Sequence, residues 1–144
     1  MVEMFVRQVM NRRIVTVKPS LTLKEASKIM GEEHIGSLIV TENEKLVGII
    51  TNSDIMRAIG NDKDPETTLV GEIMSRNVKV VEPDKSLEDA VKIMIENKIK
   101  KLPVVENNKL VGIITASDIA VVQPRLIASI ASLLSIRLPM YSGG

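Results

Sequence analysis

One segment of this chain occurs twice at a fixed spacing. Residues 48–55, with the sequence GIITNSDI, return as residues 112–119 with the sequence GIITASDI. The same register extends back without a gap to Met10 and its counterpart Met74. A repeat of this length predicts two similar structural units, and any site in one unit is expected to have a counterpart in the other.

Each copy contains the same short series of predicted elements. In the first copy, a β-branched run that stops before a proline predicts a strand at 14–17, and a capping-box sequence at 22–25 predicts the start of an amphipathic helix. Two apolar runs joined by a polar tetrapeptide predict an antiparallel hairpin, and a second helix is expected to begin near Asn52. The second copy repeats this order, although Pro103 cannot donate to a sheet, so its strand is expected to begin there or to lie at an edge.

The predicted order of strand, helix, strand, strand and helix belongs to the mixed α/β (α+β) class. Neither copy is long enough to form a generous core by itself, so the two tandem β-α-β-β-α units are expected to pack face to face with pseudo-twofold symmetry. The expected boundaries are a first unit at 1–60, a polar linker at 61–68 and a second unit at 69–123. Residues 124–144 are expected to form an apolar helix and a tail that pack on the core, on a second copy or on an effector.

Composition excludes several classes of protein. The 144 residues carry a net charge of +1, which gives no broad reason to expect nucleic-acid binding. The chain has no cysteine and a single histidine, His34, so it can form neither a disulfide nor a common Cys/His zinc site, and no metal site is expected. His34 is expected to have a structural role at a helix end. No apolar run reaches the roughly 20 residues of a membrane span and no signal peptide is apparent, so we expect a cytoplasmic protein without a membrane segment.

The repeated pattern of glycine, two hydrophobic residues, threonine, two further residues, aspartate and isoleucine closes each predicted unit. In this respect the chain resembles the cystathionine-beta-synthase (CBS) domain family, and the tandem pair resembles a Bateman module. The resemblance covers residues 6–122. It implies adenosine-containing ligands, such as AMP, ADP, ATP or S-adenosylmethionine, in clefts between two units, and it implies regulation of a partner enzyme or transporter.

The motif residues have chemistry that suits such a ligand. The carboxylates of Asp54 and Asp118 could each accept two hydrogen bonds from a ribose diol, and the hydroxyls of Thr51 and Thr115 suit a phosphate or a ribose oxygen. The glycine at the start of each motif would let a planar group approach the backbone. The same Thr-x-x-Asp segments are also capping boxes, so each aspartate could instead only satisfy backbone donors at its own helix start. The two roles are compatible.

The two copies differ in charge at the residues before their third predicted element. The resemblance implies that residues just before the Leu-Pro strand contact phosphates, and Lys100 and Lys101 occupy these positions in the second copy. Two ammonium groups favour a multiply charged anion, although lysines before an edge strand can also serve only solubility. The first copy has Gly36 and Ser37 instead, so the two sites are expected to be unequal. The resemblance also implies that main-chain groups near the first strand of each copy read the adenine: Ile14, Thr16, Val78 and Val80.

Together with these observations, the resemblance implies a non-catalytic adenine-nucleotide sensor, forming a homodimer and acting on a separate protein effector. Ligands of the S-adenosylmethionine type and a scaffold without any ligand remain alternatives. A nucleotide-converting enzyme has little support, because the chain has no Gly-rich lysine loop, no histidine in either motif and no paired nucleophile and base. No cofactor is expected beyond the sensed ligand.

Overall fold

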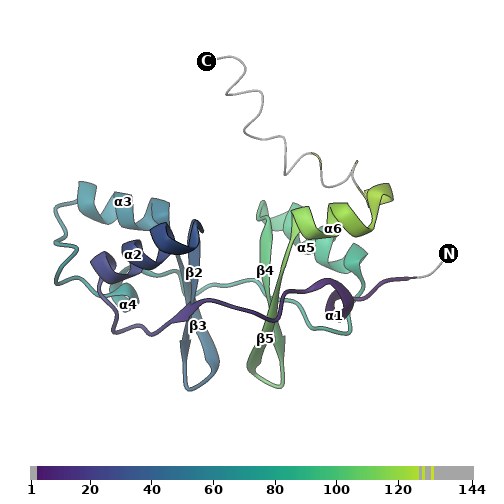
Figure 1. Cartoon of the computed structure of the whole chain (residues 1–144), viewed down its shortest axis with the longest axis horizontal. Coiled ribbons are helices and arrows are strands. Elements are labelled where there is room, and N and C mark those ends of the chain that lie inside the picture. The colour runs from purple at the N-terminus through teal and green to yellow at the C-terminus, as the bar shows by residue number, and fades with distance from the viewer. Residues whose placement is uncertain (1–2, 127, 129–130, 132–144) are drawn as a thin grey trace, which may run out of the picture. The chain divides into compact units, whose positions relative to one another are not determined.

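The computed structural model describes residues 3–126, 128 and 131. The chain divides into two compact units, shown with their helices and strands in Figure 1. We call residues 15–78 the first unit, because they contain most of the first copy of the repeat, without its residues 10–14. The second unit combines described residues of 1–14 with those from 79 onward, and it contains the second copy.

The first unit has the predicted order of elements. Its three-stranded sheet has the order β1-β2-β3, in which β1 is parallel to β2 and β2 is antiparallel to β3. Thr16 lies opposite Ile39, and Ser37 lies opposite Thr51. The elements are β1 (Thr16–Val17), α2 (Leu23–Glu33), β2 (Ser37–Glu42), β3 (Lys45–Thr51), α3 (Asn52–Gly60) and α4 (Val70–Ile73).

The second unit repeats this arrangement around a two-stranded sheet, β4-β5. Lys101 lies opposite Thr115, as Ser37 does opposite Thr51, and both hairpins have an irregularity at the same place in their register. The elements are α1 (Val6–Val9), α5 (Leu87–Asn97), β4 (Lys101–Glu106), β5 (Lys109–Thr115), α6 (Ala116–Val122) and the 3-10 turn η1 (Pro124–Leu126). The mixed helix-and-strand fold predicted from the sequence is thus confirmed.

The predicted strand at 78–81 is reduced to one parallel bridge between Val81 and Val104. The cause is Pro103, the counterpart of Ile39. Its carbonyl accepts a hydrogen bond from the Val81 N–H (3.1 Å), but a proline has no N–H with which to extend the ladder. In the first copy Ile39 has that donor, and there β1 forms, although it starts at Thr16 and is therefore two residues shorter than predicted.

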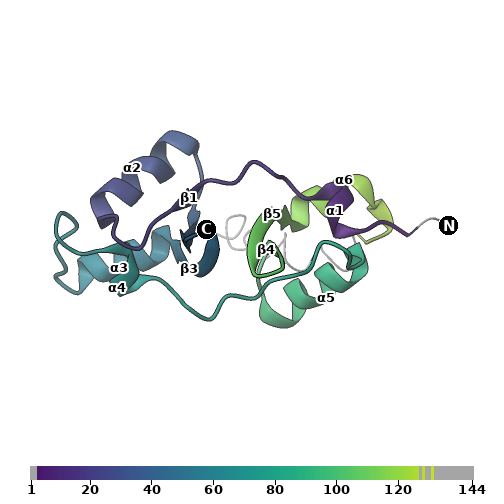
Figure 2. The same cartoon turned by 90° about the horizontal axis from the view of Figure 1, so that it is seen from below.

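Each unit also contains a short helix that immediately precedes the other copy of the repeat in the sequence. Helix α1 precedes the first copy in sequence but packs on β5 and α6, and both Figure 1 and Figure 2 show it beside α6. Helix α4 follows the first copy and packs on α3 and β3. Each compact unit therefore includes a segment that adjoins the other copy in the sequence, and the expected boundaries at residues 60 and 69 stay a prediction. Most of the C-terminal helix and tail expected at 124–144 lies outside the described residues.

The repeated glycines make this packing possible. A Cβ atom on Gly48 would lie 2.5 Å from the Met74 Sδ and 2.9 Å from the Ser75 carbonyl oxygen. A Cβ atom on Gly112 would lie 2.6 Å from the Met10 Sδ. These glycines therefore admit a segment of the protein itself, which corrects the expectation that they leave room for a planar ligand.

The core of each unit lies between its sheet and helices. The predicted apolar stripes are buried: Leu23, Ala26 and Met30 in α2, and Leu87, Ala90 and Met94 in α5. Both helices are followed by a C-cap residue with left-handed backbone, His34 (φ 56°) after α2 and Lys98 (φ 54°) after α5. No helix among the described residues is long and apolar enough to cross a membrane.

Candidate functional site

In the first unit, the predicted site residues gather at one end of the sheet. Ser37 begins β2 and lies opposite Thr51, the last residue of β3. Helix α3 begins at once, and the Asn52 N–H donates to the Gly36 carbonyl over 2.9 Å. Thr16, at the start of β1, lies opposite the second residue after Ser37. The start of α3 and the ends of β2 and β3 therefore share this edge, and Thr16 lies further along the sheet.

Asp54 is held at that edge by contacts within its own helix. The Thr51 N–H donates to Asp54 Oδ2 (2.9 Å), and the Asp54 N–H donates to Thr51 Oγ1 (3.1 Å). The Arg57 guanidinium donates to the other carboxylate oxygen, Oδ1, over 3.1 Å. The Asp54 side chain is only 21% exposed. The capping box predicted from the sequence is present, and both carboxylate oxygens have a partner.

The second unit brings together the corresponding residues with different chemistry. Lys101 begins β4 opposite Thr115, and the Ala116 N–H donates to the Lys100 carbonyl over 2.9 Å. Thr115 Oγ1 caps α6 by accepting from the Asp118 N–H (3.1 Å). Asp118 is exposed, and within the described part of the chain its carboxylate makes no hydrogen bond or ion pair. An unengaged carboxylate and two lysines thus lie at one sheet end.

Burial lowers the pKa of Lys101 from its ordinary value of 10.5. The cause is partial removal of the ammonium group from water, which disfavours its charged form. An anion beside this group would counter that effect, because an opposite charge favours the protonated amine. Lys100, by contrast, is exposed.

The four residues whose main chains are expected to bind adenine do not all lie in corresponding structural positions. Thr16 is exposed on β1, and Val80 is 39% exposed next to the bridge at Val81. Ile14 and Val78 each stand where the chain passes from one unit to the other. The structure therefore places Thr16 in a strand and Val80 beside a bridge, whereas Ile14 and Val78 lie in the connecting segments.

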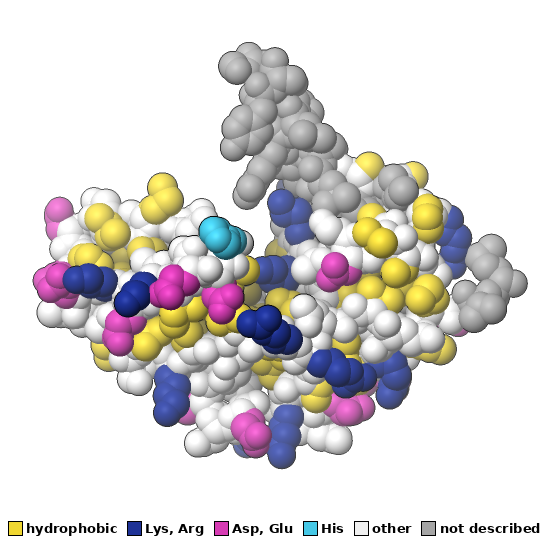
Figure 3. Space-filling view, viewed as in Figure 1, with side chains coloured by type: hydrophobic (Ala, Val, Ile, Leu, Met, Phe, Trp, Pro, Cys, Tyr) yellow, Lys and Arg dark blue, Asp and Glu magenta, His cyan; other side chains and the backbone are white. Residues whose placement is uncertain are grey.

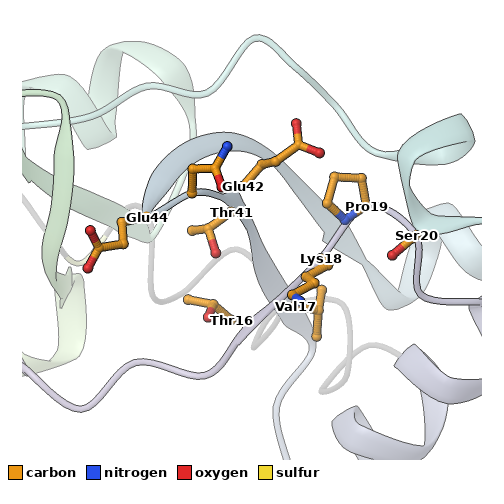
Figure 4. Close-up of a pocket in the computed structure, with 9 residues that line it drawn as sticks. Thr16, Val17, Lys18, Pro19, Ser20, Thr41, Glu42 and Glu44 are labelled. Atoms are coloured by element: carbon orange, nitrogen blue, oxygen red, sulfur yellow. The ribbon is translucent and has the colours of Figure 1, made fainter.

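A pocket of about 490 Å³ lies at the opposite end of the first sheet (Figure 4). It is formed by the chain after β1 and by the β2–β3 turn, and Lys18, Thr41, Glu42 and Glu44 are among its lining residues. Of the predicted site residues only Thr16 reaches it. The length of β2 separates this pocket from Ser37, so it is distinct from the candidate site.

Sequence reasoning missed two polar residues of the first unit. Arg57 pairs with Asp54, and both line a pocket of about 210 Å³ with Lys63 and Glu72. The amide of Asn52 lies near Gly36, since a Cβ atom there would be 3.4 Å from Asn52 Nδ2. Comparing the copies position by position would have revealed both, because their counterparts are Val121 and Ala116.

Clustered charges or grouped metal ligands away from the two sheet ends would mark a further candidate site. On the face shown in Figure 3, Lys and Arg side chains are interspersed with Asp and Glu. Among residues 3–126, 128 and 131 there is no group of three or more His, Cys, Asp or Glu side chains that could hold a metal ion. The two sheet ends therefore remain the best candidates for a ligand site.

Each of the two tandem units has a Thr-x-x-Asp helix start at the end of a hairpin, so the chain is a module of two similar units. The family model of the CBS domain matches residues 6–61 and 70–124. The chain therefore belongs to the CBS domain family, which confirms the resemblance found in the sequence. A pair of CBS domains is a regulatory module.

The chain is similar to proteins from archaea and bacteria. It is 39% identical over 128 residues to a protein of Methanopyrus kandleri, covering 87% of this chain but 65% of that one. It is 37% identical over 119 residues to the CBS domain-containing protein YhcV of Bacillus subtilis, covering 82% and 84%. The CBS domain pair of protein MJ0100, solved with 5′-methylthioadenosine and S-adenosyl-L-methionine, matches with a TM-score of 0.75 and 29% identity over 86% of this chain and 98% of that one.

Proposed function

We propose that this protein is a non-catalytic sensor of adenine nucleotides of the AMP, ADP or ATP type, with one ligand site on each unit. The observation that carries the proposal is the arrangement in the second unit. There the exposed carboxylate of Asp118 follows the end of β5, and Lys100 and Lys101 stand at the start of the adjacent strand. One sheet end thus offers an acceptor for a diol and donors for an anion.

Each group has a separate role in this proposal. The Asp118 carboxylate accepts hydrogen bonds from the two ribose hydroxyls, while Lys100 and Lys101 neutralise the phosphates. Thr115 contributes a hydroxyl beside them. In the first unit the corresponding groups are Asp54, Thr51 and Ser37, with Thr16 nearby. Main-chain groups near the first strands would bind the adenine.

A ligand of the S-adenosylmethionine type is the second candidate, because the MJ0100 pair was solved with that compound. The charges of this chain argue against it. A sulfonium cation would be repelled by the ammonium groups of Lys100 and Lys101, whereas phosphates would be attracted. Calorimetry with ATP, AMP and S-adenosylmethionine in parallel separates the candidates, and tighter binding of the sulfonium compound would reverse the proposed order.

Regulation requires that the ligand favour one state of the protein over another. Exposed apolar side chains on the helices after each motif support a homodimer as the regulated assembly: Met56 (70% exposed) and Ile59 (49%) on α3, and Val121 (80%) on α6. The dimer would act on a separate protein effector in the cytoplasm.

The decisive test is Asp118→Ala, with Ser117→Ala as a matched control. Loss of hydrogen bonds to a charged group costs about 1.5–3 kcal/mol, which corresponds to roughly 10- to 150-fold weaker nucleotide binding at the second unit. The Asp118 side chain caps nothing, so the variant should unfold at nearly the same temperature as the parent.

Unchanged nucleotide affinity in Asp118→Ala would refute the site assignment. A ligand at 100 times its dissociation constant adds about 2.7 kcal/mol of stability. A panel of adenosine compounds that gives no thermal shift at all would favour the scaffold, and conversion of ATP by pure protein that is lost in Asp118→Ala would favour an enzyme.

A further inference from the structure

Identical motifs hold their aspartates in different ways. Asp54 accepts from the Thr51 N–H on one carboxylate oxygen and from the Arg57 guanidinium on the other, over 2.9 and 3.1 Å. Asp118 makes neither contact within the described residues. The position that corresponds to Arg57 is Val121, which has no donor on its side chain.

This difference bears directly on a ribose diol. A diol presents two donors, and binding both to one carboxylate is easiest when its two oxygens are unoccupied. At Asp118 the diol would displace only water. At Asp54 it would compete with a guanidinium that lies three residues further along the same helix, where i,i+3 neighbours meet.

We propose that Arg57 determines the inequality of the two ligand sites. By pairing with Asp54 it acts as an internal competitor for the ribose, so the second unit binds first and more tightly, and the first unit fills only at higher ligand concentration. Arg57 is therefore a specificity-determining residue. This inference rests on the proposed function, because it assumes that both aspartates bind a ribose.

The charge of Arg57 could also attract ligand phosphates, so the probe must separate the two effects. Adenosine carries the ribose diol but no phosphate. With adenosine the attraction of Arg57 for an anion has no role, whereas its competition for Asp54 remains. AMP, measured in parallel, would show a smaller benefit from removing Arg57, because the lost attraction offsets part of the gain.

The experiment measures each site alone in the full-length chain. Asp118→Ala leaves only the first site, and Arg57→Val is added to it. Asp54→Ala leaves only the second, and Val121→Arg is added there. Exposed ion pairs contribute about 0.2–1 kcal/mol, so we expect Arg57→Val to tighten adenosine binding by up to about fivefold and Val121→Arg to weaken it by a similar factor.

Lys63→Met is the matched control in the Asp118→Ala background, because Lys63 lines the same pocket as Arg57 but makes no ion pair with Asp54. It should leave adenosine affinity unchanged. Weaker or unchanged binding in Arg57→Val would overturn the role of Arg57 while leaving the sensor function intact. Absence of adenosine, AMP, ADP and ATP binding to the unmodified chain would overturn both proposals.

Discussion

The two units have nearly the same framework but differ at the sheet end that carries the candidate site. Gly48 admits Met74, and Gly112 admits Met10, with almost the same separation. The hairpins share their register irregularity. At the site, by contrast, a neutral serine and an ion-paired aspartate in one unit correspond to a lysine and an unengaged aspartate in the other.

The duplicated features are of two kinds, those that pack in the framework and those that lie at the sheet ends. Packing features are constrained by the close approach of atoms, so a larger residue at Gly48 would displace Met74 and the Ser75 backbone, and one at Gly112 would displace the Met10 side chain. The charged residues at the sheet ends lie outside the core, and they can differ between units without disturbing it. Substitutions in the packed framework should therefore have similar effects on stability in both units, whereas substitutions at the sheet ends should have different effects in the two units.

The largest effect is expected for Gly48→Ala and Gly112→Ala, which should each destabilise the protein by about 1–3 kcal/mol through overpacking. Gly48→Ala should cost more, because its Cβ would lie 2.9 Å from a backbone oxygen, against 3.2 Å for Gly112. Denaturant unfolding measures both. The control is Gly31→Ala in α2, where a Cβ would have no neighbour within 4 Å, and which should stabilise by about 0.5–1 kcal/mol.

Wild-type stability in both of the first two variants would mean that the methionine packing is easily rearranged, and the proposed likeness of the frameworks would lose its main support.

A smaller effect should come from the helix ends. Relieving the left-handed strain at His34 or Lys98 with glycine should stabilise each unit by about 0.5–1 kcal/mol, since the strain costs 1–2 kcal/mol and glycine returns part of that as chain entropy. Thermal unfolding provides the measurement. The control Asn97→Gly, one residue before Lys98 and inside α5, should lower the unfolding temperature instead. If this control also stabilised the protein, relief of left-handed strain could not be the cause of the effect.

The smallest effect concerns pH and should appear only through the second unit. Because the pKa of Lys101 in the folded state is below 10.5, the unfolded chain binds more protons in the interval between the two values. The free energy of unfolding should therefore rise with pH across that interval in the parent relative to Lys101→Met. Ser37→Ala, at the corresponding position of the first unit, should leave the pH profile unchanged. A parent profile parallel to that of Lys101→Met would contradict the burial of this ammonium group.

Much of the fold could be predicted because its determinants are local. Thr22 with Glu25 and the apolar stripe of α2 specify a helix start and a buried face within a few residues. The loss of the strand expected at 78–81 in the second copy, next to Pro103, could not be predicted from local sequence. It depends on which neighbouring strand the missing Pro103 N–H would have faced. The packing of α1 on β5 is likewise a contact between distant segments.

The candidate site was predictable in its residue types but not in its contacts. The Thr-x-x-Asp motif identified Asp54 and Asp118 together, and a motif cannot show which carboxylate is already engaged. That depends on Arg57, three residues beyond the motif aspartate, and on the rotamer that brings its guanidinium to Oδ1. The inequality of the two sites, expected from Lys100 and Lys101, stays a prediction, and the contact between Arg57 and Asp54 gives a second reason for it.

The placement of α1 has a consequence for how the protein is made. The first unit is continuous in sequence, so it can fold as soon as residue 78 has left the ribosome. Asn11, which exchanges two backbone hydrogen bonds with Ile113, must wait until nearly the whole described chain has been synthesised. During synthesis the first unit can therefore be folded while the N-terminal segment with Asn11 still lacks its partner strand β5. A gene divided between the two repeats would yield a second product that contains Gly112 but lacks Met10, the residue that packs on it.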